Sequence, residues 1–152
     1  MTVTVGDVAP GFTLPGVHDG TRGEYSLAQY RGRAVLLVFY PGDNTPICTR
    51  QLNAYTADLA QFEAVDATIL ALSPQDLDSH EGFARAQGGF GFPLLADLDK
   101  AVGDSYGVLG PVGFYRRSIV VVDPSGLVSH VHRGHAASTF RPTAELLAAL
   151  RA

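Results

Sequence analysis

The pattern of apolar and polar positions predicts two strands in the first half of the chain. Ala34–Tyr40 is an unbroken apolar run that ends at a turn signal, Pro41-Gly42. A run of this kind with a turn behind it is typical of a buried strand. Ala67–Leu72 is a second short run, apolar except for Thr68, and Ser73-Pro74 ends it. We therefore predict a strand over each run.

Helical spacing of apolar residues follows the first of these strands. Leu52, Tyr55, Leu59 and Phe62 recur at intervals of three, four and three, which places them on one face of a helix. Three further helices are predicted over Asp76–Gln87 (stopped by Gly88-Gly89), Leu98–Tyr106 and Pro142–Leu150.

Two more strands are predicted on either side of a turn. Ser118–Val122 and Leu127–His132 flank Asp123-Pro124-Ser125-Gly126, in which proline and glycine stand where a tight turn favours them. We expect these strands to form a hairpin. The alternation of strands and helices, without a repeat or linker, predicts an α/β fold with a mixed sheet in a single domain over residues 1–152.

Composition limits the partners that the chain can be expected to have. With 46% hydrophobic and 17% charged residues, the sequence is that of a globular protein. The net charge of −4 gives no reason to expect nucleic acid or an anionic membrane. No apolar segment approaches the ~18 residues that span a bilayer, and residues 1–7 carry no secretory signal. The single cysteine excludes an intrachain disulfide, and we expect a cytoplasmic protein.

That cysteine, Cys48, lies where a helix is predicted to begin. Thr45 suits the N-cap and Pro46 the first helical position, so Cys48 is third. A capping box holds Glu or Gln at this position, and the helix end stabilises negative charge there. An arbitrary lone cysteine is more often a buried apolar side chain. At this position, however, the sequence favours a reactive thiolate.

The spacing of Pro41, Thr45 and Cys48 resembles the active-site motif of the peroxiredoxins. The other segments that resemble the family, in order, are Val5–Pro15, Leu27–Pro41, Leu72–Pro74, Phe92–Asp97, Tyr106–Val108 and Arg117–Asp123. The chain is most similar to the bacterioferritin comigratory protein type, also called peroxiredoxin Q. This resemblance implies a thioredoxin-like fold, with a central mixed β-sheet flanked by helices.

The resemblance also implies a thiol-dependent peroxidase that reduces hydrogen peroxide and organic hydroperoxides. The thiolate of Cys48 would attack the O–O bond and become a sulfenic acid. Arg117 would supply a cation beside the sulfur, Thr45 a hydroxyl in the same small volume, and Pro41 a pocket wall that limits water. The simpler alternatives are that Thr45 is an ordinary N-cap and Pro41 a strand terminator.

Arg116 is the alternative to Arg117 for the role beside the sulfur. The spacing of six residues to Asp123, as in the family, favours Arg117. Adjacent residues on a strand point to opposite faces, so at most one of the two arginines should face the pocket.

The histidines could instead indicate a metal site. His130, His132 and His135 lie close together in the sequence, but no nearby cysteine or carboxylate completes a ligand set. A solvated strand edge is the preferred interpretation, and His18 and His80 are predicted to be surface residues. The sequence also lacks a phosphate-binding glycine loop. We therefore expect neither a metal nor another cofactor.

Two residues depart from the family pattern. Asn53 stands five residues after Cys48, where many members of the subgroup have a resolving cysteine. The resemblance then implies a one-cysteine enzyme recycled by an external thiol: thioredoxin, glutaredoxin or a low-molecular-weight thiol. Gln51 stands where relatives commonly have Glu, which keeps the hydrogen-bond acceptor but loses the charge. Related proteins include both monomers and homodimers.

Other classes of function remain open at this point. A thioredoxin-fold redox-sensing thiol protein would keep Cys48 reactive but consume peroxide slowly. A binding module would simply bury Cys48, although the intact set of Pro41, Thr45, Cys48 and Arg117 argues against this. A cysteine hydrolase is weaker still, because no histidine is placed in the sequence as an obvious base.

Overall fold

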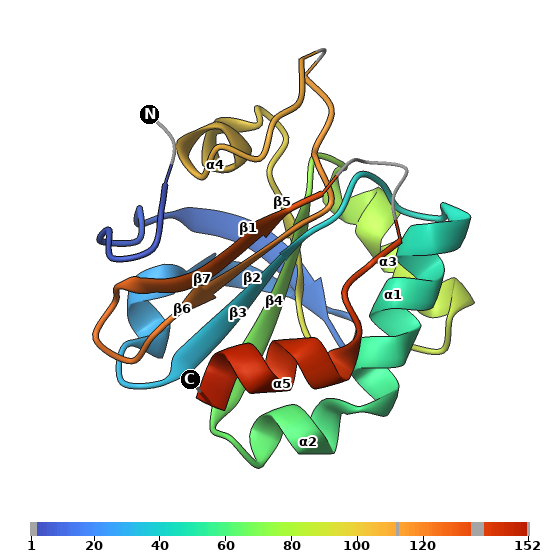
Figure 1. Cartoon of the computed structure of the whole chain (residues 1–152). Coiled ribbons are helices and arrows are strands. Elements are labelled where there is room, and N and C mark those ends of the chain that lie inside the picture. Colours follow the sequence, from blue (N-terminus) through green and yellow to red (C-terminus); the bar gives the residue numbers. More distant parts are fainter. Residues whose placement is uncertain (1–2, 112, 135–138, 152) are drawn as a thin grey trace.

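A seven-stranded sheet forms the centre of the protein in a computed structural model, which describes residues 3–111, 113–134 and 139–151 (Figure 1). The strands are β1 (Thr13–His18), β2 (Thr21–Ser26), β3 (Ala34–Phe39), β4 (Ala67–Ser73), β5 (Leu94–Ala96), β6 (Ser118–Val122) and β7 (Val128–Arg133). The helices are α1 (Pro46–Ala57), α2 (Leu59–Glu63), α3 (Leu77–Ala86), α4 (Ala101–Ser105) and α5 (Thr143–Arg151), with a 3-10 turn at Leu27–Tyr30. None of the helices that the structure describes could cross a membrane.

The strand order is β2-β1-β5-β4-β3-β6-β7, with parallel and antiparallel neighbours. β3 and β4 are parallel, as are β4 and β5, whereas β6 lies antiparallel to both β3 and β7. The predicted hairpin of β6 and β7 is therefore confirmed, and so is the mixed sheet. Because β3 and β4 run side by side, with Phe39 opposite Leu72, the loops that follow them leave the same end of the sheet.

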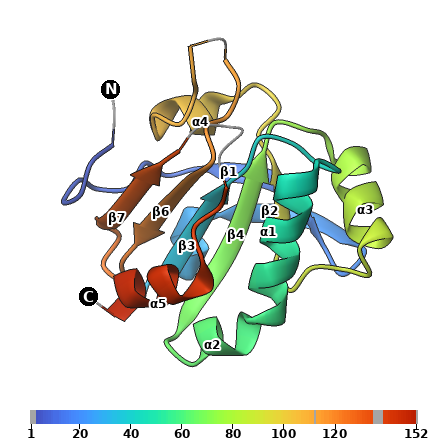
Figure 2. The ribbon, with the colours of Figure 1, turned by 45° about the vertical axis from the view of Figure 1, so that its right-hand side comes forward.

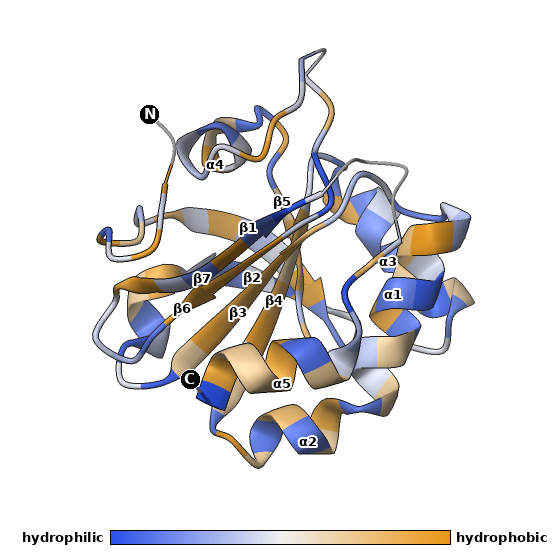
Figure 3. Cartoon of the chain, viewed as in Figure 1, coloured by the Kyte–Doolittle hydropathy of each residue, from blue (hydrophilic) through white to orange (hydrophobic). Residues whose placement is uncertain are grey.

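Helices cover the sheet on both faces, which explains the unbroken apolar run of β3. Alternate residues of the run face opposite ways: Leu36 and Val38 pack with α1, α2, α3 and α5, whereas Val35 and Leu37 pack with α4. Figures 1 and 2 show α1, α3 and α5 together on one side and α4 on the other. In Figure 3 the strands at the centre of the sheet are the most apolar part of the chain.

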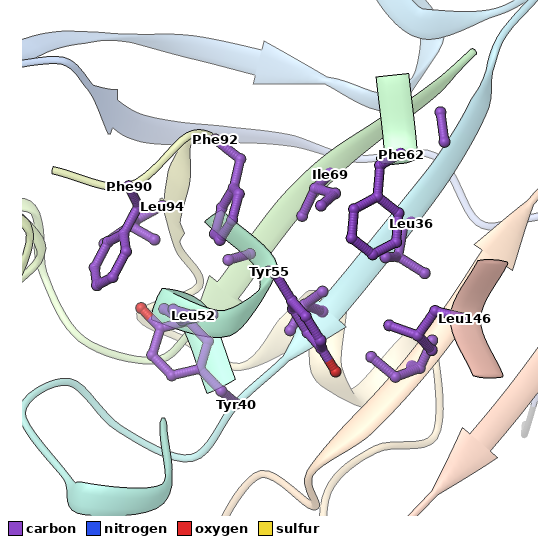
Figure 4. Packing of buried hydrophobic residues seen from close by; sticks show 14 of the residues in the cluster. Leu36, Tyr40, Leu52, Tyr55, Phe62, Ile69, Phe90, Phe92, Leu94 and Leu146 are labelled. Carbon is purple, nitrogen blue, oxygen red and sulfur yellow. The ribbon is translucent and has the colours of Figure 1, made fainter. Parts of the chain in front are cut away.

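The larger core lies between β3, β4 and the helices of the first face. Figure 4 shows most of its aromatic residues, among them Tyr55 of α1 and Phe62 of α2, together with Leu146 of α5. The Tyr55 hydroxyl donates to the carbonyl oxygen of Arg141 at 2.6 Å, which ties α1 to the segment before α5. Burial raises the pKa of Tyr55 to about 12, so this phenol remains a donor at neutral pH.

The structure differs from the sequence prediction in three respects. The helix predicted through Phe62 is broken at Asp58, which serves as the end of α1 and the start of α2. The helix predicted over Leu98–Tyr106 is only the short α4. The hairpin of β1 and β2 and the three-residue β5 were not predicted, because β2 is exposed along most of its length and β5 is too short to show a pattern. The predicted stop of α3 is confirmed, with Gly88 at φ 80° and Gly89 at φ 94°.

Candidate functional site

The first turn of α1 carries Cys48 at the position that the sequence predicts. Thr45 is the N-cap, Pro46 opens the helix, and Cys48 is the third helical residue. The cysteine is free and fully buried. A negative charge on its sulfur would lie at the positive end of the helix dipole, away from bulk water.

The Thr45 hydroxyl does not cap the helix, contrary to the simplest interpretation of this residue. It donates instead to the carbonyl oxygen of Gly42 at 2.8 Å, and no capping hydrogen bond from the side chain is formed. Asn44 has a left-handed backbone with φ 61°, and this turn brings Thr45 back toward Gly42. Since the hydroxyl proton is directed at Gly42, the oxygen of Thr45 keeps lone pairs with which to accept a hydrogen bond.

Arg117, rather than Arg116, lies beside the sulfur. Its Nη1 atom is 3.2 Å from the Sγ of Cys48, and only 5% of the residue is exposed. Arg116 points elsewhere and donates to the carbonyl oxygens of Gly134 and Arg133, at 3.2 and 3.1 Å. The expectation that at most one arginine would face Cys48 is met.

Gln51 of α1 also contacts the guanidinium of Arg117. Its Oε1 accepts from Nη1 of Arg117 at 2.7 Å, so one guanidinium nitrogen touches both the amide oxygen and the sulfur. The residue is fully buried, and its Nε2 has no hydrogen-bond partner among the described residues. The acceptor role of Gln51 agrees with the sequence analysis.

The loop of residues 41–45, between β3 and α1, is held by side chains that the sequence analysis did not single out. Gln75 accepts a hydrogen bond from the backbone N–H of Asp43 at 3.1 Å and donates to the carbonyl oxygen of Pro41 at 3.4 Å. Ser73 in turn donates to Oε1 of Gln75 at 2.5 Å. Pro41 itself is half-buried. These contacts cross between the ends of two parallel strands, which sequence spacing alone does not reveal.

The prediction that His80 is a surface residue is wrong. His80 is fully buried, with Nδ1 2.7 Å from Oδ2 of Asp43 and Nε2 3.0 Å from the carbonyl oxygen of Leu95. Burial of a polar ring is tolerated here because both nitrogens have partners. One signal could have revealed it: His80 lies three residues before Phe83, on the same face of α3. His18, by contrast, is one-third exposed, at 33% of its side chain.

Two of the three clustered histidines, His130 and His132, lie on β7. His130 and His132 are half-buried on this edge strand, and no group of three potential ligands is found among the described residues. His135 lies outside the described residues. Burial lowers the pKa of His132, which keeps its imidazole neutral at physiological pH.

Asn53 of α1, five residues after Cys48, links two helices. Its Nδ2 donates to Oε1 of Gln87, the residue that ends α3, at 2.9 Å. A cavity of about 410 Å³ lies between α3 and the turn that joins β1 and β2. Cys48 is not among the residues that line this cavity, so the cavity is not the place where a substrate would meet the sulfur.

The chain is similar to peroxiredoxins in both sequence and structure. The AhpC/TSA family matches residues 5–131. A Mycobacterium tuberculosis protein named as a peroxiredoxin is 38% identical over 133 residues, which are 83% of this chain and 82% of that protein. Peroxiredoxin-2 of Mus musculus is 33% identical over 134 residues, 84% of this chain and 68% of that protein.

The structural comparison agrees with these relatives. The reduced 2-Cys peroxiredoxin of Plasmodium vivax matches with a TM-score of 0.91 and 31% identity, over 97% of this chain and 80% of that one. The fold is therefore thioredoxin-like, with helices on both faces of the central sheet. The chain belongs to the AhpC/TSA family and is a peroxiredoxin, a thiol-dependent peroxidase.

Proposed function

We propose that Cys48 is the sole nucleophile of a one-cysteine peroxiredoxin that reduces hydrogen peroxide and organic hydroperoxides. The observation that carries this proposal is the contact of 3.2 Å between Nη1 of Arg117 and the buried Sγ of Cys48. A guanidinium at this distance stabilises a thiolate, and a helix N-terminus adds to the effect. No other sulfur nucleophile of this kind exists in the sequence, which has one cysteine.

The reaction requires a nucleophile, an aligned O–O bond and a stabilised leaving oxygen. The thiolate attacks the outer peroxide oxygen, an S–O bond forms as the O–O bond breaks, and the sulfur becomes a sulfenic acid. The leaving oxygen departs as water or an alcohol after it gains a proton. Arg117 supplies fixed N–H donors beside the sulfur, where negative charge moves during the attack. Pro41 has no N–H and contributes an apolar wall.

Thr45 is proposed to orient the peroxide through its hydroxyl oxygen. With the proton held by Gly42, this oxygen is free to accept a hydrogen bond from a peroxide O–H. Thr45→Val, which removes the hydroxyl, should slow sulfenic acid formation about 10²-fold. Thr45→Ser is the matched control and should retain most of the rate. Single-turnover kinetics measure both, and equal rates for Val and Ser would refute this role.

The chain is proposed to be a one-cysteine variant of the peroxiredoxin Q type, recycled by an external thiol in the cytoplasm. Asn53 cannot form a disulfide with Cys48, so a sulfenic acid has no partner in its own chain. Thioredoxin, glutaredoxin and low-molecular-weight thiols are the candidate reductants, and the enzyme would act as a monomer or a homodimer. If recycling were inefficient, the same chemistry would serve a redox sensor.

The test of this proposal uses one equivalent of peroxide. We expect the mass of the chain to rise by one oxygen and a sulfenic acid trap to capture the product. A small thiol should then convert it to a mixed disulfide. Excess peroxide without thiol should inactivate the enzyme progressively through the irreversible sulfinic acid.

Two outcomes would contradict this account. If non-reducing gels show mainly a covalent dimer, the Cys48 thiol of one chain forms a disulfide with the oxidised Cys48 of another. Peroxide consumption that stays slow with every reductant would favour the redox-sensing protein over the peroxidase cycle.

A further inference from the structure

A buried pair of Asp43 and His80 lies behind the active-site loop and has no part in the peroxide chemistry described above. Asp43 belongs to the loop of residues 41–45, whereas His80 belongs to α3. Their side chains are 1% and 0% exposed, and Nδ1 of His80 is 2.7 Å from Oδ2 of Asp43. A buried pair of ionisable groups is costly unless its hydrogen bonds are satisfied. The surroundings of both groups therefore indicate what the pair does.

Every polar atom of the pair has a partner. Nε2 of His80 faces the carbonyl oxygen of Leu95 at 3.0 Å, and a carbonyl only accepts, so Nε2 carries a proton. The hydroxyl of Tyr40 donates to Oδ1 of Asp43, and that of Ser79 to Oδ2, each at 2.7 Å. With Nδ1 of His80, Asp43 thus contacts three side chains that can donate a hydrogen bond to it.

Tyr40 is held in the protonated form that this arrangement needs. Burial, and then the carboxylate of Asp43, raise the pKa of Tyr40 well above its usual range. The phenol is thus a permanent donor at physiological pH. A carboxylate with three side-chain donors, in a site closed to water, has one well-defined orientation.

Asp43, which carries this carboxylate, is the central residue of the loop of residues 41–45. Pro41 and Thr45, the two loop residues proposed to contact peroxide, are each two positions away from Asp43. The backbone N–H of Asp43 is bound by Gln75, so the loop is held at this residue by both main chain and side chain. The Gln75 contact comes from the segment after β4, and the His80 contact from α3.

We propose that Asp43 and His80 are positioning residues for peroxide reduction, which fix the conformation of the loop that carries Pro41 and Thr45. They act on the orientation of the peroxide. The charge on the sulfur is governed separately, by Arg117 and the start of α1. This inference rests on the proposed roles of Pro41 and Thr45.

The separation of the two effects makes the proposal testable with two reagents for Cys48. Reaction with peroxide needs the aligned loop, whereas alkylation by iodoacetamide needs only a thiolate that the reagent can reach. Asp43→Ala should lower the second-order rate with hydrogen peroxide about 10- to 100-fold, as expected for a displaced substrate-positioning group. Its alkylation rate should be unchanged or higher.

Three further variants serve as controls. Asp43→Asn keeps an acceptor for Tyr40 and an amide donor for a neutral His80, so it should retain most of the peroxide rate. Ser79→Ala removes one donor of three and should slow peroxide reaction less than Asp43→Ala does. Asp76→Ala removes the side-chain cap of α3, which accepts from the N–H of Ser79, and lowers stability without touching the pair. It should leave the peroxide rate unchanged.

The results that would overturn the proposal are specific. They are a wild-type peroxide rate in folded Asp43→Ala, or a loss as large in Asp43→Asn as in Asp43→Ala. A parallel fall of peroxide and alkylation rates would also overturn it. If Asp43→Ala does not fold, Ser79→Ala serves as the test instead. A wild-type peroxide rate in Ser79→Ala would then refute the positioning role of Asp43 and His80. If Thr45→Val reacts normally with peroxide, the proposed function of the loop fails. If Thr45→Val is slow but the Asp43 and Ser79 variants are not, the proposed role of Thr45 stands and only the positioning role of Asp43 and His80 fails.

Discussion

Replacing Cys48 with serine is expected to abolish peroxide reduction while the protein stays folded. Serine is close to cysteine in shape and fits the buried site, but its hydroxyl is not ionised beside Arg117 and does not attack peroxide at a useful rate. Peroxide loss in the presence of each candidate reductant measures the activity, and circular dichroism with thermal unfolding measures the fold. The loss should be complete, because the sequence has no other cysteine.

The wild-type thiol provides a second measurement for the same prediction. The ultraviolet absorbance of the thiolate, followed against pH and compared with the serine variant, gives the ionised fraction of Cys48. We expect a thiolate at neutral pH, where a free cysteine with pKa ~8.5 is mostly protonated. Appreciable peroxidase activity in Cys48→Ser, or a wild-type thiol that remains protonated at neutral pH, would contradict the mechanism.

Arg117→Ala is expected to slow sulfenic acid formation about 10²–10³-fold, the usual effect of removing one preorganised donor. The variant loses the N–H beside Sγ and also leaves the Oε1 of Gln51 without this donor. Stopped-flow kinetics with limiting peroxide measure the chemical step, and thermal unfolding separates it from lost stability.

Arg116→Ala is the matched control, because it changes the neighbouring residue and the same charge. Its guanidinium binds carbonyl oxygens at the end of β7, so we expect little effect on the rate. Arg117→Lys should recover only part of the rate, since an ammonium keeps the charge but lacks the planar fork. Equal losses in Arg117→Ala and Arg116→Ala would show that the contact with Cys48 is not what matters.

Local patterns were sufficient to predict the elements that carry the cysteine and the arginine. The apolar run of Ala34–Tyr40 is buried on both faces, and Thr45-Pro46 marks the start of α1 because these residues have strong positional preferences. Strand alternation implied that at most one of Arg116 and Arg117 faces the pocket, and the family spacing to Asp123 favoured Arg117. These features depend on residues that are close together in the sequence, so they can be predicted from it.

The contacts behind the loop could not be predicted in the same way. Asp43 meets His80 across 37 positions, and Asp43 meets Gln75 across 32. Such contacts depend on which strands are neighbours in the sheet, and no spacing in the sequence encodes that order. His80 was placed on the surface because its sequence neighbours are polar, while the partners that bury it come from other elements.

Because Gln51 is neutral, the charge beside the sulfur is set by Arg117 and by the state of Cys48. If Cys48 is a thiolate in the reduced state, as proposed, its negative charge offsets the positive charge of Arg117, while Gln51 contributes only an amide oxygen. Conversion to a neutral sulfenic acid removes one negative charge, and the surroundings of the sulfur become more positive by one unit. Two unit charges about 4 Å apart interact by about 4 kcal/mol at an effective dielectric constant of about 20. An incoming thiolate is therefore attracted to the site, whereas the neutral peroxide is not. The oxidation step thus suits a neutral reactant, and the recycling step suits a negatively charged one.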